Sequence, residues 1–172
     1  MRLYRKQYAY PVVFGKLRAT SNGEAITISP SIPTELKEEI GYWRKANHIH
    51  RWFVENVQES QDDGTEYDVE RHKLAQLLQT VILVLNASEL IPGKVSVGYY
   101  HEGGKRIQLL ESGRIIKDPE KAETLLPTQE GFFFGKTDYD EDYYADLVWT
   151  IEVLEAALKS PLDVTFTYQS SW

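Results

Sequence analysis

The side chains best suited to binding a ligand fall on one face of a helix that the sequence predicts to include residues 41–52, at about 100° per residue. These side chains are Arg44, Lys45, His48, Arg51 and Trp52. Fixed positive charges beside an indole ring suit an anionic aromatic molecule such as a nucleotide, through ion pairing and stacking. Gly41 lies on the same side and would let a ligand approach bare backbone. The alternative is a solvated helix face whose cations pair with Glu38 or Glu55.

Two polar residues, Asn47 and His50, lie within the apolar stripe of the same helix, between Trp43 and Val54. A buried amide or imidazole needs hydrogen-bond partners. One interpretation is a polar pair that lines a ligand pocket, and the other is a satisfied core pair that pins a nearby loop. The candidate loop is residues 127–137, because no regular ladder occupies its backbone. Its candidate pocket residues are Thr128, Gln129 and Phe133.

No segment of the sequence has the spacing of a known catalytic or metal-binding motif. The loop segment GFFFGKT ends like a phosphate-binding P-loop, but three residues rather than four separate its glycines. Tight turns with phenylalanines plugged into the core are the expected alternative. Three aspartates at 138, 140 and 142 resemble the start of a calcium loop, but Tyr143 and Trp149 occupy its glycine and glutamate positions. The histidines have no metal-ligand spacing and the chain has no Cys, so no metal, cofactor or catalytic residue is predicted.

Composition narrows the class of protein further. The chain has 172 residues, a formal net charge of −7 and 42% apolar residues, so one domain over residues 1–172 is expected. The acidic balance argues against a general nucleic-acid binder. The longest aliphatic run, Val81–Leu85, is far shorter than the roughly 20 residues of a membrane span, and no apolar signal region begins the chain. We therefore expect a protein of the cytoplasm that does not enter a membrane.

The elements that must position these residues predict an α+β fold. Ser21-Asn22-Gly23 indicates an N-terminal hairpin, and Thr34 is the expected N-cap of the helix that carries the basic face. That helix is expected over residues 35–58, and a second helix over 68–86. An inserted β-hairpin over 93–117 turns at Gly103-Gly104, and a short helix follows over 119–126. A helix then begins at Asp138, with Glu141 in a capping box, and the chain ends in the strand DVTFTYQ. The expected architecture is an antiparallel sheet from the N-terminal hairpin and the C-terminal strand, packed with three main helices.

Three long segments carry a family resemblance: IPTELKEEIGYWRKANHIHRWFVENVQ, LLPTQEGFFFGKTDYDEDYYADLVWTIEVLE and the terminal YQSSW. Together they resemble an uncharacterised family of short bacteriophage and prophage proteins, over residues 32–172. The resemblance implies an accessory gene product that acts in the cytoplasm of a host cell. It supplies no catalytic residues.

These features predict a binding protein that antagonises a host defence factor, by sequestering an anionic nucleotide-like signal or by masking a host protein. A homo-oligomer could build the pocket between chains. An alternative is a hydrolase acting on a nucleotide, with His48 or His50 as acid and base. Another is a protein–protein inhibitor that uses the inserted hairpin as its arm.

Overall fold

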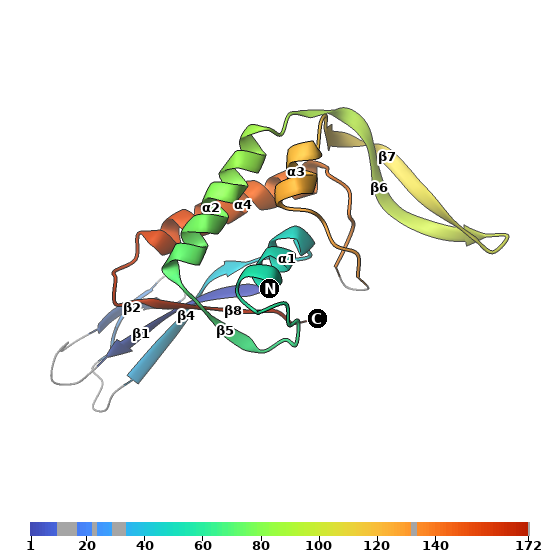
Figure 1. The fold of residues 1–172 in the computed structure, drawn as a ribbon. Helices are drawn as coiled ribbons and strands as arrows, with labels where there is room; N and C mark the ends of the chain where they lie inside the picture. Colours follow the sequence, from blue (N-terminus) through green and yellow to red (C-terminus); the bar gives the residue numbers. More distant parts are fainter. Residues whose placement is uncertain (10–16, 22–23, 29–33, 132–133, 172) are drawn as a thin grey trace.

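The computed structural model describes residues 1–9, 17–21, 24–28, 34–131 and 134–171 (Figure 1). In chain order its elements are β1 (Arg2–Ala9), β2 (Leu17–Ser21), β3 (Glu24–Ile28), β4 (Thr34–Tyr42), α1 (Asn47–Asn56), β5 (Glu66–Val69), α2 (Arg71–Asn86), β6 (Leu90–Glu102), β7 (Lys105–Ile116), α3 (Glu120–Leu125), α4 (Glu141–Leu158) and β8 (Thr165–Gln169). The α+β class predicted from the sequence is confirmed. Of the helices in these ranges, none combines the length and the apolar character needed to cross a membrane.

The main sheet is antiparallel and has the strand order β4-β1-β8-β5. Its two central strands come from opposite ends of the chain, so that Leu3 of β1 is the ladder partner of Tyr168 of β8. The predicted partner of the C-terminal strand was the N-terminal hairpin, but the strand that pairs with β8 is β1. The hairpin exists as β2 and β3, which form a separate two-stranded sheet. Its expected turn residues, Asn22 and Gly23, lie outside the described residues.

The predicted helix over residues 35–58 is wrong in its first half. Residues 34–42 form β4, which pairs with β1 from Ala9↔Thr34 to Arg2↔Tyr42, and α1 begins only at Asn47. Thr34 therefore begins a strand and caps no helix. Gly41 does not leave bare backbone either, because a Cβ built there would lie 2.6 Å from Cγ1 of Val153 on α4.

Cross-strand charge pairing explains why this segment is a strand. Arg5 of β1 forms an ion pair with Glu38 of β4, and Nε of Arg2 lies 2.9 Å from Oε2 of Glu39. Each such pair stabilises a sheet by about 0.2–1 kcal/mol. The sequence TELKEEI has high intrinsic helix propensity, but that preference is weak beside a full ladder and a buried sheet face. The partner strand lies about 30 residues earlier in the chain, so no local pattern reveals the pairing.

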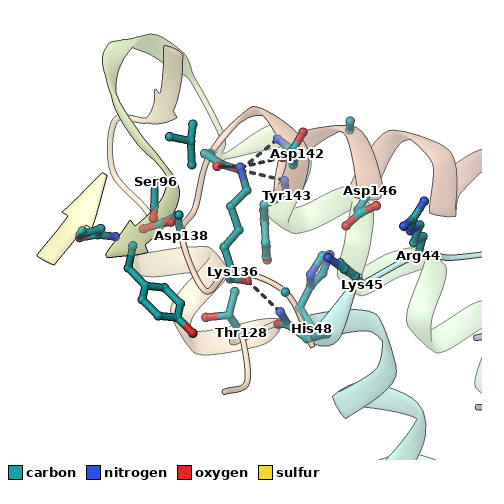
Figure 2. A pocket seen from close by; sticks show the side chains of 18 residues that line it. Arg44, Lys45, His48, Ser96, Thr128, Lys136, Asp138, Asp142, Tyr143 and Asp146 are labelled. Atoms are coloured by element: carbon teal, nitrogen blue, oxygen red, sulfur yellow. Dashed lines mark hydrogen bonds and ion pairs between the residues drawn. The ribbon is translucent and has the colours of Figure 1, made fainter. Parts of the chain in front are cut away.

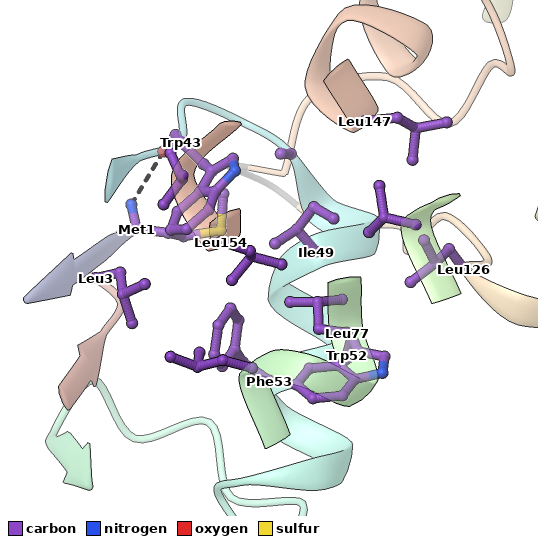
Figure 3. Packing of buried hydrophobic residues seen from close by; sticks show 14 of the residues in the cluster. Met1, Leu3, Trp43, Ile49, Trp52, Phe53, Leu77, Leu126, Leu147 and Leu154 are labelled. Atoms are coloured by element: carbon purple, nitrogen blue, oxygen red, sulfur yellow. Dashed lines mark hydrogen bonds between the residues drawn. The ribbon is translucent and has the colours of Figure 1, made fainter. Parts of the chain in front are cut away.

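The helices lie on one side of the main sheet, and the core fills the space between them (Figures 1 and 3). The Phe53 ring of α1 stacks on the Tyr168 ring of β8, with centroids 3.9 Å apart and an interplanar angle of 7°. Fully buried side chains from each layer include Leu3, Ile49, Phe53, Leu74, Leu77, Leu147, Leu154 and Phe166. Most residues of α1 are buried, including Ile49, Trp52 and Phe53, so this helix belongs largely to the core.

Two helix starts differ from prediction. Asp68 lies in β5 opposite Thr167, so α2 begins at Arg71. The N-cap of α4 is Asp140, whose Oδ1 accepts hydrogen bonds from the backbone N–H groups of Asp142 (3.0 Å) and Tyr143 (3.3 Å). Asp138, the expected start, lies in the preceding loop. A side chain that reaches the orphan N–H groups of the first turn decides such a boundary.

The inserted hairpin is present and projects from the body as a long arm, formed by β6 and β7 over residues 90–116 (Figure 1). Its turn is at Gly103 and Gly104, as predicted, with φ values of 58° and 77° that suit glycine. The strands begin to pair at Leu90↔Ile116, slightly closer to the body than expected. The backbone N–H of Ile116 donates to the carbonyl of Tyr139 (2.9 Å), which fastens the base of the arm to the body.

Candidate functional site

A pocket of about 950 Å³ opens between the arm and the body (Figure 2). Its walls come from four places: residues 44–48, the loop of residues 128–138, the first turns of α4, and the arm. Few concave sites of this size occur in a small protein, and they are the usual place for a small ligand. Four of the residues predicted from the segment around α1 line it, and they are Arg44, Lys45, Asn47 and His48.

Arg44 and Lys45 supply unpaired positive charge to this pocket. Both are exposed and precede α1, so they lie in a turn and not on a helix face. Lys45 has a φ of 65°, and a Cβ at Gly135 would lie 3.0 Å from its Cβ. Within the described ranges, neither side chain forms a hydrogen bond or an ion pair. Glu38 pairs instead with Arg5, so the cations at this position are available for an anionic ligand.

His48 is almost completely buried, with 3% of its surface exposed, yet it lines the pocket. Its ring packs against the Tyr143 ring, with centroids 4.2 Å apart. Its Nε2 atom has no hydrogen-bond partner among the described residues. Burial lowers the pKa of His48 to about 3, so the imidazole is neutral at pH 7. A neutral imidazole ring whose nitrogen is buried without a partner can form one hydrogen bond with a ligand.

Carboxylates contribute as much to the pocket as cations do, which corrects the prediction of a basic face. Lys136 pairs with both Asp140 and Asp142, and its Nζ lies 2.7 Å from Oδ2 of Asp142. Asp146 lies one turn further along α4. Its burial, together with the charges of Asp142 and Asp140, raises its pKa to about 7. Asp138 adds another carboxylate to the lining. The ligand must therefore suit a site with separated positive and negative groups.

Asn47 holds the loop that forms one wall. Its Nδ2 donates to the carbonyl oxygens of Phe134 and Lys136, both at 2.9 Å, and its Oδ1 accepts from the backbone N–H of Gln129 at 2.9 Å. The amide of Asn47 thus supplies the loop backbone with hydrogen bonds that a neighbouring strand would otherwise supply. Asn47 is thus a positioning residue that also lines the pocket, and it matches the interpretation of a core side chain that pins residues 127–137.

His50 lies apart from the pocket lining. Its Nδ1 is 2.8 Å from the Tyr168 hydroxyl and its Nε2 is 3.1 Å from Oδ2 of Asp62. Its ring also packs edge-on against Phe134, with centroids 5.5 Å apart. The side chain is fully buried, and burial lowers its pKa in spite of Asp62. His50 therefore ties α1 to the C-terminal strand.

Several predicted site residues do not line the pocket. Arg51 pairs with Glu55 at 2.7 Å along α1, as the solvated-face alternative expected. Trp52 is buried and packs edge-on against Phe53, so its indole belongs to the core. Thr128 does line the pocket, whereas Gln129 contributes its backbone N–H to Asn47. Phe133 lies outside the described residues.

Sequence reasoning missed the acidic wall and the arm's contribution. The arm residues in the lining include Ser96, Tyr99 and Gln108. The spacing of Asp142 and Asp146 could have indicated the acidic wall, because residues four apart lie on the same face of a helix. Nothing local could show that the arm and the first turns of α4 line the same pocket, since that depends on how the hairpin leaves the body.

In the part of the chain that the structure describes, no group of three His, Asp or Glu side chains could hold a metal ion. No protein-family model, no curated protein and no solved structure matches the chain.

Proposed function

We infer that this is a binding protein that sequesters a small anionic, nucleotide-like molecule and thereby antagonises a host factor. The observation that carries the proposal is the pair Arg44 and Lys45, which line a pocket of about 950 Å³ and have no side-chain partner among the residues that the structure describes. A volume of this order suits a nucleotide. Two cations side by side provide charge-assisted hydrogen bonds to phosphate oxygens. The resemblance to phage accessory proteins supports the host setting.

The titratable groups favour binding over hydrolysis. His50 is held by Tyr168 and Asp62 and does not line the pocket. His48 lines it, but a pKa of about 3 makes the imidazole a weak base at neutral pH. An enzyme using either histidine as its acid and base is therefore the weaker alternative.

Thermal unfolding of the purified chain against mono-, di- and cyclic nucleotides tests the proposal. A ligand at 100 times its Kd stabilises the folded state by about 2.7 kcal/mol, a rise of roughly 5–10 °C for a domain of this size. The ligand should be recovered intact after denaturation. Recovery of a converted compound would instead establish an enzyme, and a flat panel would contradict nucleotide binding.

A matched pair of variants locates the site. Arg44→Ala with Lys45→Ala should abolish the thermal shift and leave the unliganded Tm unchanged, because both side chains are exposed and unpaired in the described structure. Arg51→Ala is the control, since it removes a neighbouring cation that pairs with Glu55 outside the pocket. Loss of the shift in the control alone would move the site to the outer face of α1.

The arm favours a second candidate function, docking to a host protein. It exposes large apolar side chains, including Leu109 (45%) and Leu110 (54%), which do not line the pocket. Exposed apolar surface of this kind marks interaction sites. Leu109→Ser with Leu110→Ser should abolish capture of a host protein and keep the nucleotide shift. Deleting the whole arm would not separate the two functions, because the arm is also a wall of the pocket.

A further inference from the structure

The pocket has two chemically different ends. Figure 2 shows Arg44 and Lys45 at one side, whereas Asp138 and Ser96 lie together at the other. A phosphate group held by the cations would leave the remainder of a nucleotide directed along the pocket. The base of such a nucleotide would therefore lie at the end near Asp138.

The arm, which contributes Ser96 to the lining, also carries an aromatic ring and an amide side by side. Tyr99 of β6 and Gln108 of β7 are ladder partners, and both line the pocket. Opposite residues of an antiparallel pair project to the same face of the ribbon. Tyr99 as a whole is 53% exposed, and its ring packs edge-on against that of His101, with centroids 5.6 Å apart. A tyrosine ring offers a stacking surface to any base, and the neighbouring amide both donates and accepts hydrogen bonds.

Asp138 adds an acceptor with two oxygens. Among the described residues its carboxylate forms no hydrogen bond and no ion pair, although the residue is half-buried. The same pocket contains the buried Nε2 of His48, also without a partner in the described ranges. The described residues offer these two groups no partner, which is the expected state of a site whose partners arrive with a ligand.

We propose that Asp138, Tyr99 and Gln108 form a nucleobase subsite that prefers guanine. The inference rests on the proposed function, because it assigns the second half of the same ligand. Guanine presents N1–H and the 2-amino group side by side, and a carboxylate accepts both, whereas adenine presents an acceptor at N1. The ring stacks on Tyr99, and the Gln108 amide donates to O6. A guanine nucleotide bound in this way contacts the body through its phosphate and the arm through its base.

Calorimetric titration of the full chain with guanosine, inosine and adenosine 5′-monophosphates and with ribose 5-phosphate tests the subsite. The guanine compound should bind roughly tenfold more tightly than the adenine compound, with hypoxanthine between them, as expected for a bidentate pair. Asp138→Asn should bring the three nucleotides to similar affinity and leave ribose 5-phosphate unaffected. Tyr99→Ala should weaken all three nucleotides roughly tenfold, again without affecting ribose 5-phosphate. Leu110→Ala is the control on the arm.

The two possible failures are distinguishable. If neither the nucleotides nor ribose 5-phosphate bind, the proposed function is overturned together with the subsite. If the nucleotides bind with equal affinity, and Asp138→Asn and Tyr99→Ala change nothing, phosphate capture stands and the guanine subsite is wrong.

Discussion

Two neighbouring polar residues, Asn47 and His48, have different roles at the pocket. Asn47 and His48 are adjacent in α1, and both are buried at the edge of the pocket. The amide of Asn47 is fully engaged with the loop, whereas the Nε2 of His48 has no partner in the described structure. One residue therefore builds the site, and its neighbour is available to a ligand.

Replacing Asn47 should destabilise the protein through the loop. Asn47→Ala leaves two carbonyl oxygens and one N–H of the loop without their partner, which costs roughly 2–3 kcal/mol in the free energy of unfolding. Urea denaturation measures it. Asn47→Asp should be no better, because a carboxylate would face the carbonyls of Phe134 and Lys136. The exposed Asn86→Ala is the matched control and should change stability by less than about 0.5 kcal/mol.

Asp146 should make stability depend on pH. The residue is half-buried near Asp142 and Asp140, and its pKa is raised to about 7. Arg44, Lys45 and His48 also line this pocket. Because the folded state holds this proton more tightly than the unfolded chain does, the contribution is present at low pH and is lost as pH rises from about 4 to 7.

Asp146→Asn should therefore stabilise the protein at pH 8 by roughly 1–3 kcal/mol and have little effect at pH 4. The measurement is urea unfolding of wild type and variant at both pH values. Burial lowers the pKa of His48 and gives the opposite slope, but that slope is common to both proteins and cancels in their difference. Asp163→Asn, an exposed carboxylate, is the control for net charge. Equal gains at pH 4 and pH 8 would contradict the assignment.

At the scale of elements, the first half of the predicted helix became the edge strand β4. The ladder to β1 and the ion pairs of Arg5 with Glu38 and of Arg2 with Glu39 hold it in the sheet. Gly41 then lies under α4, where its missing side chain allows close packing against Val153. The strand ends just before Arg44 and Lys45, so β4 delivers the two cations to the mouth of the pocket.

Gly41→Ala distinguishes the strand from the helix by the sign of its effect. In a helix the substitution would stabilise by about 1 kcal/mol. In β4 the added Cβ would lie 2.6 Å from Cγ1 of Val153, so a loss of roughly 1–3 kcal/mol is expected. The cost should shrink in a Val153→Ala background, which a double-mutant cycle by thermal unfolding measures. A stabilising Gly41→Ala would contradict the packing.

At the scale of the whole molecule, the pocket lies between the arm and the body, which are otherwise in contact near the base of the arm. The arm meets the body near its base, where Ile116 N–H donates to Tyr139 and Lys117 N–H donates to Glu89. A ligand that touches both Arg44 on the body and Gln108 on the arm would add a contact further out along the hairpin. Ligand binding and the orientation of the arm are then linked.

Hydrogen exchange tests this link. With saturating nucleotide, the backbone amides of residues 94–98 and 108–112 should exchange at least roughly tenfold more slowly, because opening of this segment must release the ligand. Amides at the turn of residues 103–104 should be unchanged, since they lie beyond the pocket. Equal protection along the whole arm, or none, would contradict a ligand held between the arm and the body.

Local sequence patterns were sufficient for the elements whose signals are local. The apolar stripes of α2 and α4, the Gly103-Gly104 turn and the alternation of the C-terminal strand predicted those elements to within a few residues. In the two helices and the turn, the backbone hydrogen bonds or the turn conformation link residues close in the chain. The strand β8 pairs with the distant strands β1 and β5, and its signal was the alternation of its own side chains. The α+β class followed from these elements.

Only the tertiary structure decided the identity of β4 and the composition of the pocket. The segment TELKEEI suits either a helix or a strand, and its pairing with β1, about 30 residues earlier, selects the strand. The pocket brings together Arg44, Asp146 and Gln108 from three distant segments. Helical periodicity grouped the cations with His48 because it compares neighbours in the chain, although Arg44 and Lys45 precede α1. It could not find the carboxylates or the arm, because their distance from the cations is set by packing.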